Sequence, residues 1–288
     1  MSTEKKLEEY IKSMPSLPTS LIKILEVCDH PQTSPADLNN IISLDPVLVG
    51  RVLKLINSAY CGLGKSVKNL TRAIIMLGVN TVKNLALSTT IIALFPGKLS
   101  PGLDMEAFWR HSLCVGAAAK ILARKRGINP YLTEEYFTAG LLHDIGKIPL
   151  NTIFSNEYLM AIDVADREQK PQLEAETKTL GLNHCSAGAM IALSWKLGGA
   201  LKDTIEYHHN RDEYTGDYKD ILYSVAIANR FASNSGRGYF GSHYAKPLSP
   251  SVWETLNISS NILNEIEASV SSEIEKAEIF LKIGLSKE

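Results

Sequence analysis

Apolar side chains recur every three or four residues along most of the chain, which is the spacing of one face of an α-helix. In the first hundred residues this pattern marks five or six short helices, among them one that places Leu17, Leu21, Ile24, Leu25 and Cys28 on a single face. Asp45-Pro46 starts another, with a capping residue followed by a proline in the first helical position. No window of five or more residues alternates strictly enough to predict a β-strand. The pattern therefore predicts an all-α fold that begins with a compact helical bundle.

Longer helices are predicted beyond a proline- and glycine-rich stretch, PGKLSPGLD, at residues 96–104. Asp104 can cap a helix that closes at Gly127, and the next helix leads into GLLHDIG, where Gly146 has the position of a helix terminator. Further helices are predicted over residues 183–196, 201–209, 219–232 and 259–283. We expect two packed helical lobes, residues 14–100 and 101–235, followed by a loop and C-terminal helices at 236–288 that pack on the second lobe.

The composition is that of an ordinary globular protein. Of the 288 residues 45% are hydrophobic, and 30 basic against 31 acidic side chains give a net charge of −1. Without a long basic tract, nucleic-acid binding is not expected. The charged start, MSTEKKLEEY, does not resemble a signal peptide, and the longest apolar run, LALSTTIIALF, is about half of the ~20 residues that span a bilayer. We expect a cytoplasmic protein without a membrane segment.

Five of the seven histidines fall on predicted helices of the second half, and one of them adjoins a carboxylate in GLLHDIGKIPL. A single inward histidine is more often a hydrogen-bonded core residue than a metal ligand. Several on separate helices, with a carboxylate beside them, favour a site for Zn, Mn or Fe. Cys114 and Cys185 also lie near these histidines, and we interpret them as small buried hydrophobic residues. The histidines are His111, His143, His184, His208 and His209, and the carboxylate is Asp144.

This series of motifs resembles that of the HD phosphohydrolase superfamily, and within it the HD-GYP branch, whose members bind two or three metal ions and hydrolyse cyclic dinucleotides. The whole chain is more similar to the HDOD family, the "HD-related output domain" of bacterial signalling proteins. That resemblance covers roughly residues 14–235 and rests on MPSLPTSLIKILEV, SLDPVLVGRVLKLINSAYCG and NLTRAIIMLG. It implies that the metal ligands are His111, His143, Asp144, His184, His208, His209 and Asn229.

The chain departs from the HD-GYP pattern in three places. Asn229 stands where the pattern has an aspartate, and an amide oxygen brings no negative charge to a shared site. We therefore expect one or two divalent ions, the second, near His184, His208 and His209, being only partly occupied. The GYP signature is absent from HHNRDEYTGDY, and Ala107 stands where some three-metal relatives have a glutamate, with Glu106 beside it.

Asp144 and Lys147 are the candidate catalytic residues. The resemblance implies that Asp144 is a ligand or orients an attacking water, and that Lys147 reaches a substrate phosphate. Lys147 has an equally good alternative interpretation, as a cation that complements a helix C-terminus.

Two hypotheses follow from the sequence. The first is a bacterial signal-transduction module that acts through a signalling protein partner or a nucleotide-like ligand, with a vestigial or structural metal. The alternative is a metal-dependent phosphohydrolase acting on a nucleotide or cyclic dinucleotide. DNA binding through the N-terminal bundle ranks third, because only short helices and a few lysines favour it.

Overall fold

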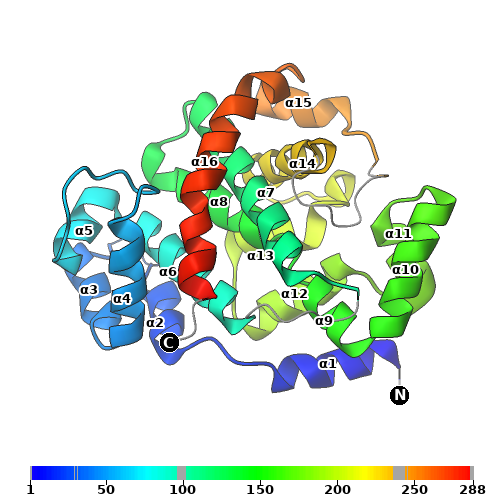
Figure 1. Cartoon of the computed structure of the whole chain (residues 1–288), viewed down its shortest axis with the longest axis horizontal. Coiled ribbons are helices and arrows are strands. Elements are labelled where there is room, and N and C mark those ends of the chain that lie inside the picture. The colour runs from blue at the N-terminus through cyan, green and yellow to red at the C-terminus, as the bar shows by residue number, and fades with distance from the viewer. Residues whose placement is uncertain are drawn as a thin grey trace.

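The computed structural model describes residues 2–28, 30, 32–95, 102–235, 244 and 246–285. Its regular structure consists of helices α1 to α16 and two 3-10 turns, η1 (Pro130–Leu132) and η2 (Arg211–Glu213), and the described residues contain no β-strand element. Figure 1 shows these helices gathered in two packed groups, as the sequence pattern predicted. The fold is all-α.

The N-terminal group contains α2 (Thr19–Cys28), α3 (Pro35–Ile42), α4 (Pro46–Ile56), α5 (Leu70–Leu77) and α6 (Val79–Leu94). Local sequence signals define several of their starts. Ser34 forms a capping box with Asp37, and the Asp45 carboxylate accepts a hydrogen bond from the Leu48 backbone amide at 2.9 Å. Gly78, with φ of 85°, lies between α5 and α6 and lets the chain turn sharply there.

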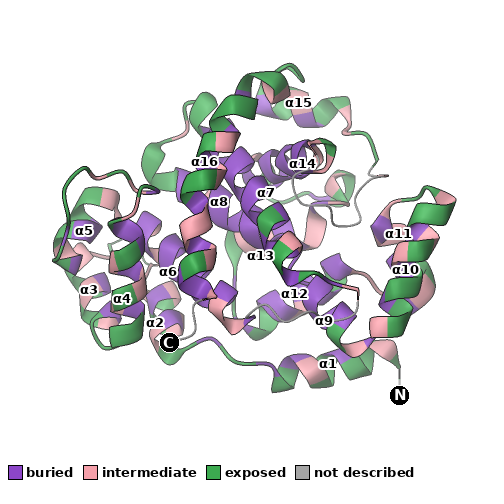
Figure 2. Cartoon of the chain, in the orientation of Figure 1, coloured by how far each residue is buried: buried purple, intermediate pink, exposed green. Residues whose placement is uncertain are grey.

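The second group is built around α7 (Met105–Lys125), α8 (Thr133–Leu142) and α14 (Lys219–Asn234), which pack against one another. Most of α7 and α14 is buried, as Figure 2 shows. The capping residue of α7 is Asp104, as predicted. Around this centre lie α9 (Lys147–Ile153), α10 (Ser155–Glu168), α11 (Gln172–Leu180), α12 (His184–Ser194), α13 (Gly199–Tyr207) and α15 (Pro250–Leu256).

The first and last helices cover the second group from outside. α1 (Thr3–Ser13) buries Leu7 and Ile11 and packs on α9 and α12. α16 (Ile262–Gly284) lies along α7 and also contacts α6 and α4, so it touches both groups (Figure 1). The lobe boundaries expected near residues 100 and 236 lie outside the described residues.

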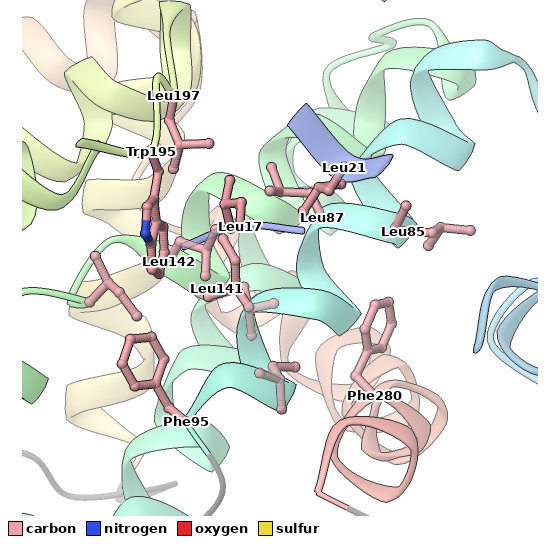
Figure 3. Close-up of a cluster of buried hydrophobic side chains, with 14 of the residues drawn as sticks. Leu17, Leu21, Leu85, Leu87, Phe95, Leu141, Leu142, Trp195, Leu197 and Phe280 are labelled. Carbon is pink, nitrogen blue, oxygen red and sulfur yellow. The ribbon is translucent and has the colours of Figure 1, made fainter. Parts of the chain in front are cut away.

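The two groups share a hydrophobic core. The larger cluster of buried side chains runs from the N-terminal helices into the second half of the chain. In Figure 3, Leu21 and Leu87 come from the N-terminal group, while Trp195 and Leu197 approach from the segment after α12. A second cluster is formed by α7, α14, α15 and the first half of α16. The halves therefore stabilise each other by burying apolar surface.

A buried charged network also crosses this junction. The Lys120 ammonium, on α7, forms ion pairs with Glu134 of α8 and, at 3.0 Å, with Glu273 of α16. The hydroxyl of Tyr60, which follows α4, donates to Glu134 at 2.7 Å, and Lys120 lies 3.9 Å from the centre of the Tyr60 ring. Four segments distant in sequence are thus joined at one buried cation.

Within the described part of the chain, no single helix is long and apolar enough to cross a membrane. Only α5 and α6 taken together reach that length, and they meet at a bend of 112°.

Candidate metal centre

The predicted ligand residues come from five separate parts of the second group. His111 lies on α7, His143 and Asp144 follow α8, His184 is the first residue of α12, His208 and His209 follow α13, and Asn229 lies on α14. All are buried except His209, which is partly exposed.

Close backbone contacts at two glycines bring these helices together. A Cβ atom on Gly146 would lie 2.0 Å from the His184 carbonyl oxygen and 2.5 Å from the Gly188 amide nitrogen, so only glycine lets the turn after Asp144 touch α12. At Gly140 of α8, a Cβ atom would lie 2.8 Å from the backbone of Gly116 on α7. The predicted role of Gly146 as a helix terminator was wrong: α8 ends at Leu142, and Gly146 has a φ of −66°.

The predicted ligand residues form two groups that share Asp144. One contains His111, His143 and Asp144, and the other contains Asp144, His184, His208 and His209; within each group the potential ligand atoms lie within 4.8 Å of one another. The Asp144 Oδ1 atom lies 3.3 Å from His184 Nε2 and 3.4 Å from His208 Nε2, whereas Oδ2 lies 3.3 Å from His143 Nε2. The carboxylate therefore stands between the two histidine groups.

Asn229 and Lys147, the two remaining predicted residues, both contact this cluster. The Asn229 Oδ1 atom lies 3.1 Å from His111 Nε2. Lys147 is the first residue of α9 and fully buried, with its ammonium 2.7 Å from Asp144 Oδ2. Lys147 therefore supplies positive charge on the side of Asp144 that faces His143.

A second layer of acceptors holds the imidazole rings by their Nδ1 atoms. His143 Nδ1 contacts the Gly140 carbonyl at 2.7 Å, and His208 Nδ1 contacts the Thr204 carbonyl at 3.1 Å. His184 Nδ1 lies 2.6 Å from the carboxylate of Glu176, on α11, which also accepts the His184 backbone amide at 2.9 Å. This arrangement turns the three Nε2 atoms towards Asp144, as second-layer partners do at metal sites.

Glu176 was missed by the sequence reading. It lies eight residues before His184 and is fully buried, but a glutamate at that spacing, in a stretch where no helix was predicted, carries no specific signal.

Several of these atoms are buried without a hydrogen bond. They are Nε2 of His143, Nε2 of His184 and both carboxylate oxygens of Asp144, of which Oδ2 forms an ion pair with the Lys147 ammonium at 2.7 Å. Leaving one buried polar atom unsatisfied costs about 1–3 kcal/mol. A divalent cation would satisfy the whole set at once, and neutral imidazoles with a carboxylate are a ligand set that Zn, Mn and Fe accept. The residues present therefore fit a metal.

Most of the imidazole rings are held neutral, and a neutral ring is the form that binds a metal ion. Burial lowers the pKa of His111 to about 3 and also lowers that of His143. Partial burial, reinforced by His208 and His184, holds the pKa of His209 below its usual range. His184 is the exception, because burial opposes its charge but the Glu176 carboxylate outweighs burial and raises the pKa of His184 to about 9. The cluster therefore stabilises a positive charge even without a metal ion, because His184 binds a proton.

A pocket of about 170 Å³ opens beside the second histidine group. Its walls include His208, His209 and Asn229, together with three basic residues, Arg211, Arg230 and Lys246. Arg211 donates to the His208 carbonyl, while its Nε atom is buried without a hydrogen-bond partner. Lys246 pairs with Glu174 at 2.7 Å. The sequence could not predict this pocket, because its walls come from α11, the segment after α13, α14 and the segment before α15.

Cys185, Cys114 and Glu106 belong to neither group of potential metal ligands. Cys185 is buried with its sulfur 3.7 Å from His208 Nδ1, and Cys114 is buried as well, which agrees with their interpretation as small core residues. Glu106 pairs with Arg110 at 2.9 Å on the surface of α7.

A family model for the HDOD domain matches residues 14–211, more than half of the chain. The chain belongs to the HDOD family. It is 27% identical over 225 residues to an uncharacterized protein of Treponema pallidum (strain Nichols), a match that covers 77% of this chain and 43% of the relative. The chain therefore spans less than half the length of that relative.

Solved structures share this fold at low sequence identity. An HDOD domain protein of unknown function from Geobacter sulfurreducens has a TM-score of 0.77 at 23% identity, with 96% of this chain and 97% of that chain covered. A proposed signal transduction protein from Marinobacter aquaeolei VT8 has a TM-score of 0.76 at 19% identity, with 99% and 62% covered. A proposed phosphohydrolase from Shewanella amazonensis SB2B has a TM-score of 0.66 at 24% identity, with 97% and 98% covered.

Proposed function

We propose that this HDOD protein binds divalent metal between α7, α8, α12 and α13 and hydrolyses a phosphate ester there. The observation that carries the proposal is the set of buried, unsatisfied ligand atoms around Asp144, beside a pocket lined by arginines. A divalent metal at such a site polarises a phosphoryl oxygen and lowers the pKa of bound water towards neutrality. The name of the Shewanella amazonensis protein, a proposed phosphohydrolase, points the same way.

The group containing His184, His208 and His209 is the stronger of the two metal positions in this proposal. It offers three imidazoles and Asp144 Oδ1, and Glu176 adds a negative charge behind His184. The group with His111 and His143 uses the Oδ2 side of Asp144, where the Lys147 ammonium already lies at 2.7 Å and would repel a cation. The sequence analysis expected the opposite order, with the partly occupied ion near His184, His208 and His209.

The pocket limits the substrate to a small or terminal phosphate group. Its volume of about 170 Å³ is below the roughly 300–1,000 Å³ of pockets that enclose drug-sized ligands, so a whole cyclic dinucleotide would not fit inside. Arg211 and Arg230 line it and supply the planar donors that bind phosphate oxygens well. Lys147 is fully buried against Asp144, so we assign it to positioning that carboxylate.

A second candidate function is a signalling module that holds a structural metal and acts through a protein partner or a nucleotide-like ligand. Two contacts favour it: Asn229 bonds His111 without adding charge, and Lys147 neutralises Asp144. Both reduce the need for a second ion, on which hydrolysis by a pair of metals depends.

Metal analysis of the purified protein, followed by assays of phosphate esters, tests the proposal. We expect one to two Mn, Fe or Zn ions per chain, and hydrolysis of p-nitrophenyl phosphate or of mononucleotides that chelation abolishes and Mn²⁺ restores. Asp144→Asn and His184→Ala should lose metal and turnover, and His143→Ala should lose the more weakly bound ion. The exposed histidine His30 provides a matched control, because His30→Ala should change neither.

The other outcomes are equally informative. Full metal occupancy without turnover of any ester would support the signalling module instead. A protein that takes up no metal on titration, and whose His143→Ala variant melts like the parent, would contradict both proposals.

A further inference from the structure

A second and larger cavity, of about 380 Å³, lies between the two groups of helices. α2 and α6 form one wall, and α8, the α12–α13 connection and Tyr218 form the other. Its volume is within the range of pockets that enclose small organic ligands. The residues that line it are Leu25, Lys83, Asn84, Leu87, Glu135, Thr138, Ala139, Lys196, Leu197, Gly198, Gly199, Ala200, Leu201 and Tyr218.

Two lysines face this cleft from opposite sides of the junction. Lys83 belongs to α6 and Lys196 to the connection after α12, and neither forms an ion pair with a carboxylate among the described residues. Glu135 is the one carboxylate in the lining, so the positive charges exceed the negative by one. A bound anion would balance these two lysine charges, one on each wall, for which the described part of the chain offers no ion pair.

Backbone donors and a buried side-chain acceptor add to these charges. α13 begins at Gly199 in the cleft, and its cap residue Gly198 supplies no side-chain acceptor, so the amides of its first turn are available to an anion. Asn84 is only 4% exposed, and its amide nitrogen donates to the Asn80 carbonyl at 2.9 Å. Its carbonyl oxygen accepts no hydrogen bond from a described residue and is available to a ligand in the lining.

The rest of the cleft is apolar and suits a ring system. Leu87 and Leu197 approach from opposite walls, as Figure 3 shows, and Leu25 lies nearby in the lining. Tyr218, which is 42% exposed, also lines the cleft. The cleft therefore combines an anion-binding end with hydrogen-bonding groups and an apolar surface.

We propose that this inter-lobe cleft binds a phosphorylated small molecule of about mononucleotide size. The phosphate group lies between Lys83, Lys196 and the first turn of α13, and the organic part packs on Leu87, Leu197 and Tyr218. Asn84 and Glu135 accept hydrogen bonds from hydroxyl or amino groups of the ligand. The proposal does not rest on the metal centre, since the cleft shares no lining residue with the pocket beside it.

Isothermal titration calorimetry of the full chain with AMP, GMP, CMP, UMP, ribose 5-phosphate, adenosine and inorganic phosphate tests this site. We expect at least one of the phosphorylated compounds to bind, and adenosine to bind at least about tenfold more weakly than AMP if AMP is the ligand. Lys83→Ala and Lys196→Ala should each weaken binding about tenfold, and Lys83→Glu should abolish it. Lys65→Ala, an exposed lysine outside the cleft, is the control and should bind like the parent.

A parallel titration in the Asp144→Asn background separates this site from the metal centre. Binding that persists there but falls in Lys83→Ala supports the cleft. Binding that is lost in Asp144→Asn and unchanged in the two lysine variants places the ligand in the metal pocket and overturns the proposal. Absence of binding by every phosphorylated compound at millimolar concentration also overturns it. Circular dichroism melting of each variant shows that the comparison is made on folded protein.

Discussion

At the scale of single residues, Glu176 determines the charge of the proposed metal centre before any ion binds. Its carboxylate lies 2.6 Å from His184 Nδ1 and outweighs burial, which alone would lower the pKa of that ring. With a pKa of about 9, His184 carries a proton on both nitrogens at pH 7. A metal ion must replace the proton on Nε2, because only a neutral imidazole nitrogen can be a ligand.

Metal binding at pH 7 should therefore release about one proton per chain, and Glu176→Gln should reduce this release towards zero. The variant should also bind Mn²⁺ about 10–100-fold more weakly, because His184 loses the partner that orients it. Calorimetric titrations in buffers with different ionisation enthalpies measure both quantities. Glu168→Gln, which removes a surface carboxylate paired with Lys178, should behave like the parent. A binding heat that does not depend on the buffer would show that His184 is already neutral.

Asn229, like Lys147, limits the second metal position, beside His111 and His143. Its Oδ1 atom lies 3.1 Å from His111 Nε2, so Asn229→Asp places a negative charge beside the group of His111 and His143. We expect this substitution to raise the metal content from nearer one ion per chain towards two, because a carboxylate is a better bridging ligand than an amide. Equilibrium dialysis against Mn²⁺, followed by elemental analysis, measures the change. An unchanged metal content would mean that Lys147, rather than Asn229, keeps the second ion out.

At the scale of elements, the helices differ in how far their sequences reveal them. Asp104 as the cap of α7 and the capping box at Ser34 are local signals, and they were readable. α9, α10 and α11 were not predicted as separate helices, because α10 and α11 are mainly surface helices and α9 has only seven residues. Glu176 lies on α11 and was missed with it. The histidines could be selected from the sequence because they lie on separate predicted helices, one of them beside a carboxylate, whereas Glu176 resembles any surface carboxylate.

The packing of α16 against α7 depends on a buried cation that the sequence pattern also did not reveal. Lys120 is 1% exposed and joins Glu134 and Glu273 at the junction. Lys120→Met keeps the apolar stem but leaves the buried Glu134 carboxylate without its cation and Glu273 with only the more distant Arg124 and Lys276, at 3.5 and 3.9 Å. We expect a loss of about 3–5 kcal/mol in the free energy of unfolding, since removing one partner of a buried ion pair strands the other.

Urea denaturation followed by circular dichroism measures this loss. Lys125→Met, on the exposed side of the same helix, should stay within about 0.5 kcal/mol of the parent. Equal stability of the two variants would mean that the carboxylates take up protons at little cost when the lysine is absent.

At the scale of the whole molecule, the sequence predicted an all-α chain in two groups of helices but not how the groups meet. Helical periodicity shows which face of a helix is apolar, and it does not show which partner covers that face. α16 illustrates this limit, because its apolar stripe was expected to dock on the second lobe, while the structure places it against α4 and α6 as well as α7. The shared core and the cleft between the groups arise from such long-range contacts, so neither could be derived from local pattern.

The cleft and the metal centre are connected by the same three helices. α8 lines the cleft with Glu135 and Thr138 and leads to His143, while α13 begins in the cleft at Gly199 and leads to His208. α12 begins at His184, and the segment after it reaches the cleft at Lys196. At 1.5 Å per residue, the nine residues of α13 separate the two sites by only about 13 Å along the helix. A ligand that holds these helices together at one end therefore restricts the metal ligands at the other.

We expect the phosphorylated ligand of the cleft to increase the affinity for Mn²⁺ at least about fivefold, the lower end of typical coupling between sites. By thermodynamic linkage, Mn²⁺ must then increase the affinity for that ligand by the same factor. Titrating each in the presence and absence of the other measures both factors, and their equality is an internal check. In Lys83→Glu, which cannot hold the phosphate, Mn²⁺ affinity should be the same with and without the ligand. Mn²⁺ affinity that stays constant at saturating ligand in the parent would show that the two sites act independently, although they share α8, α12 and α13.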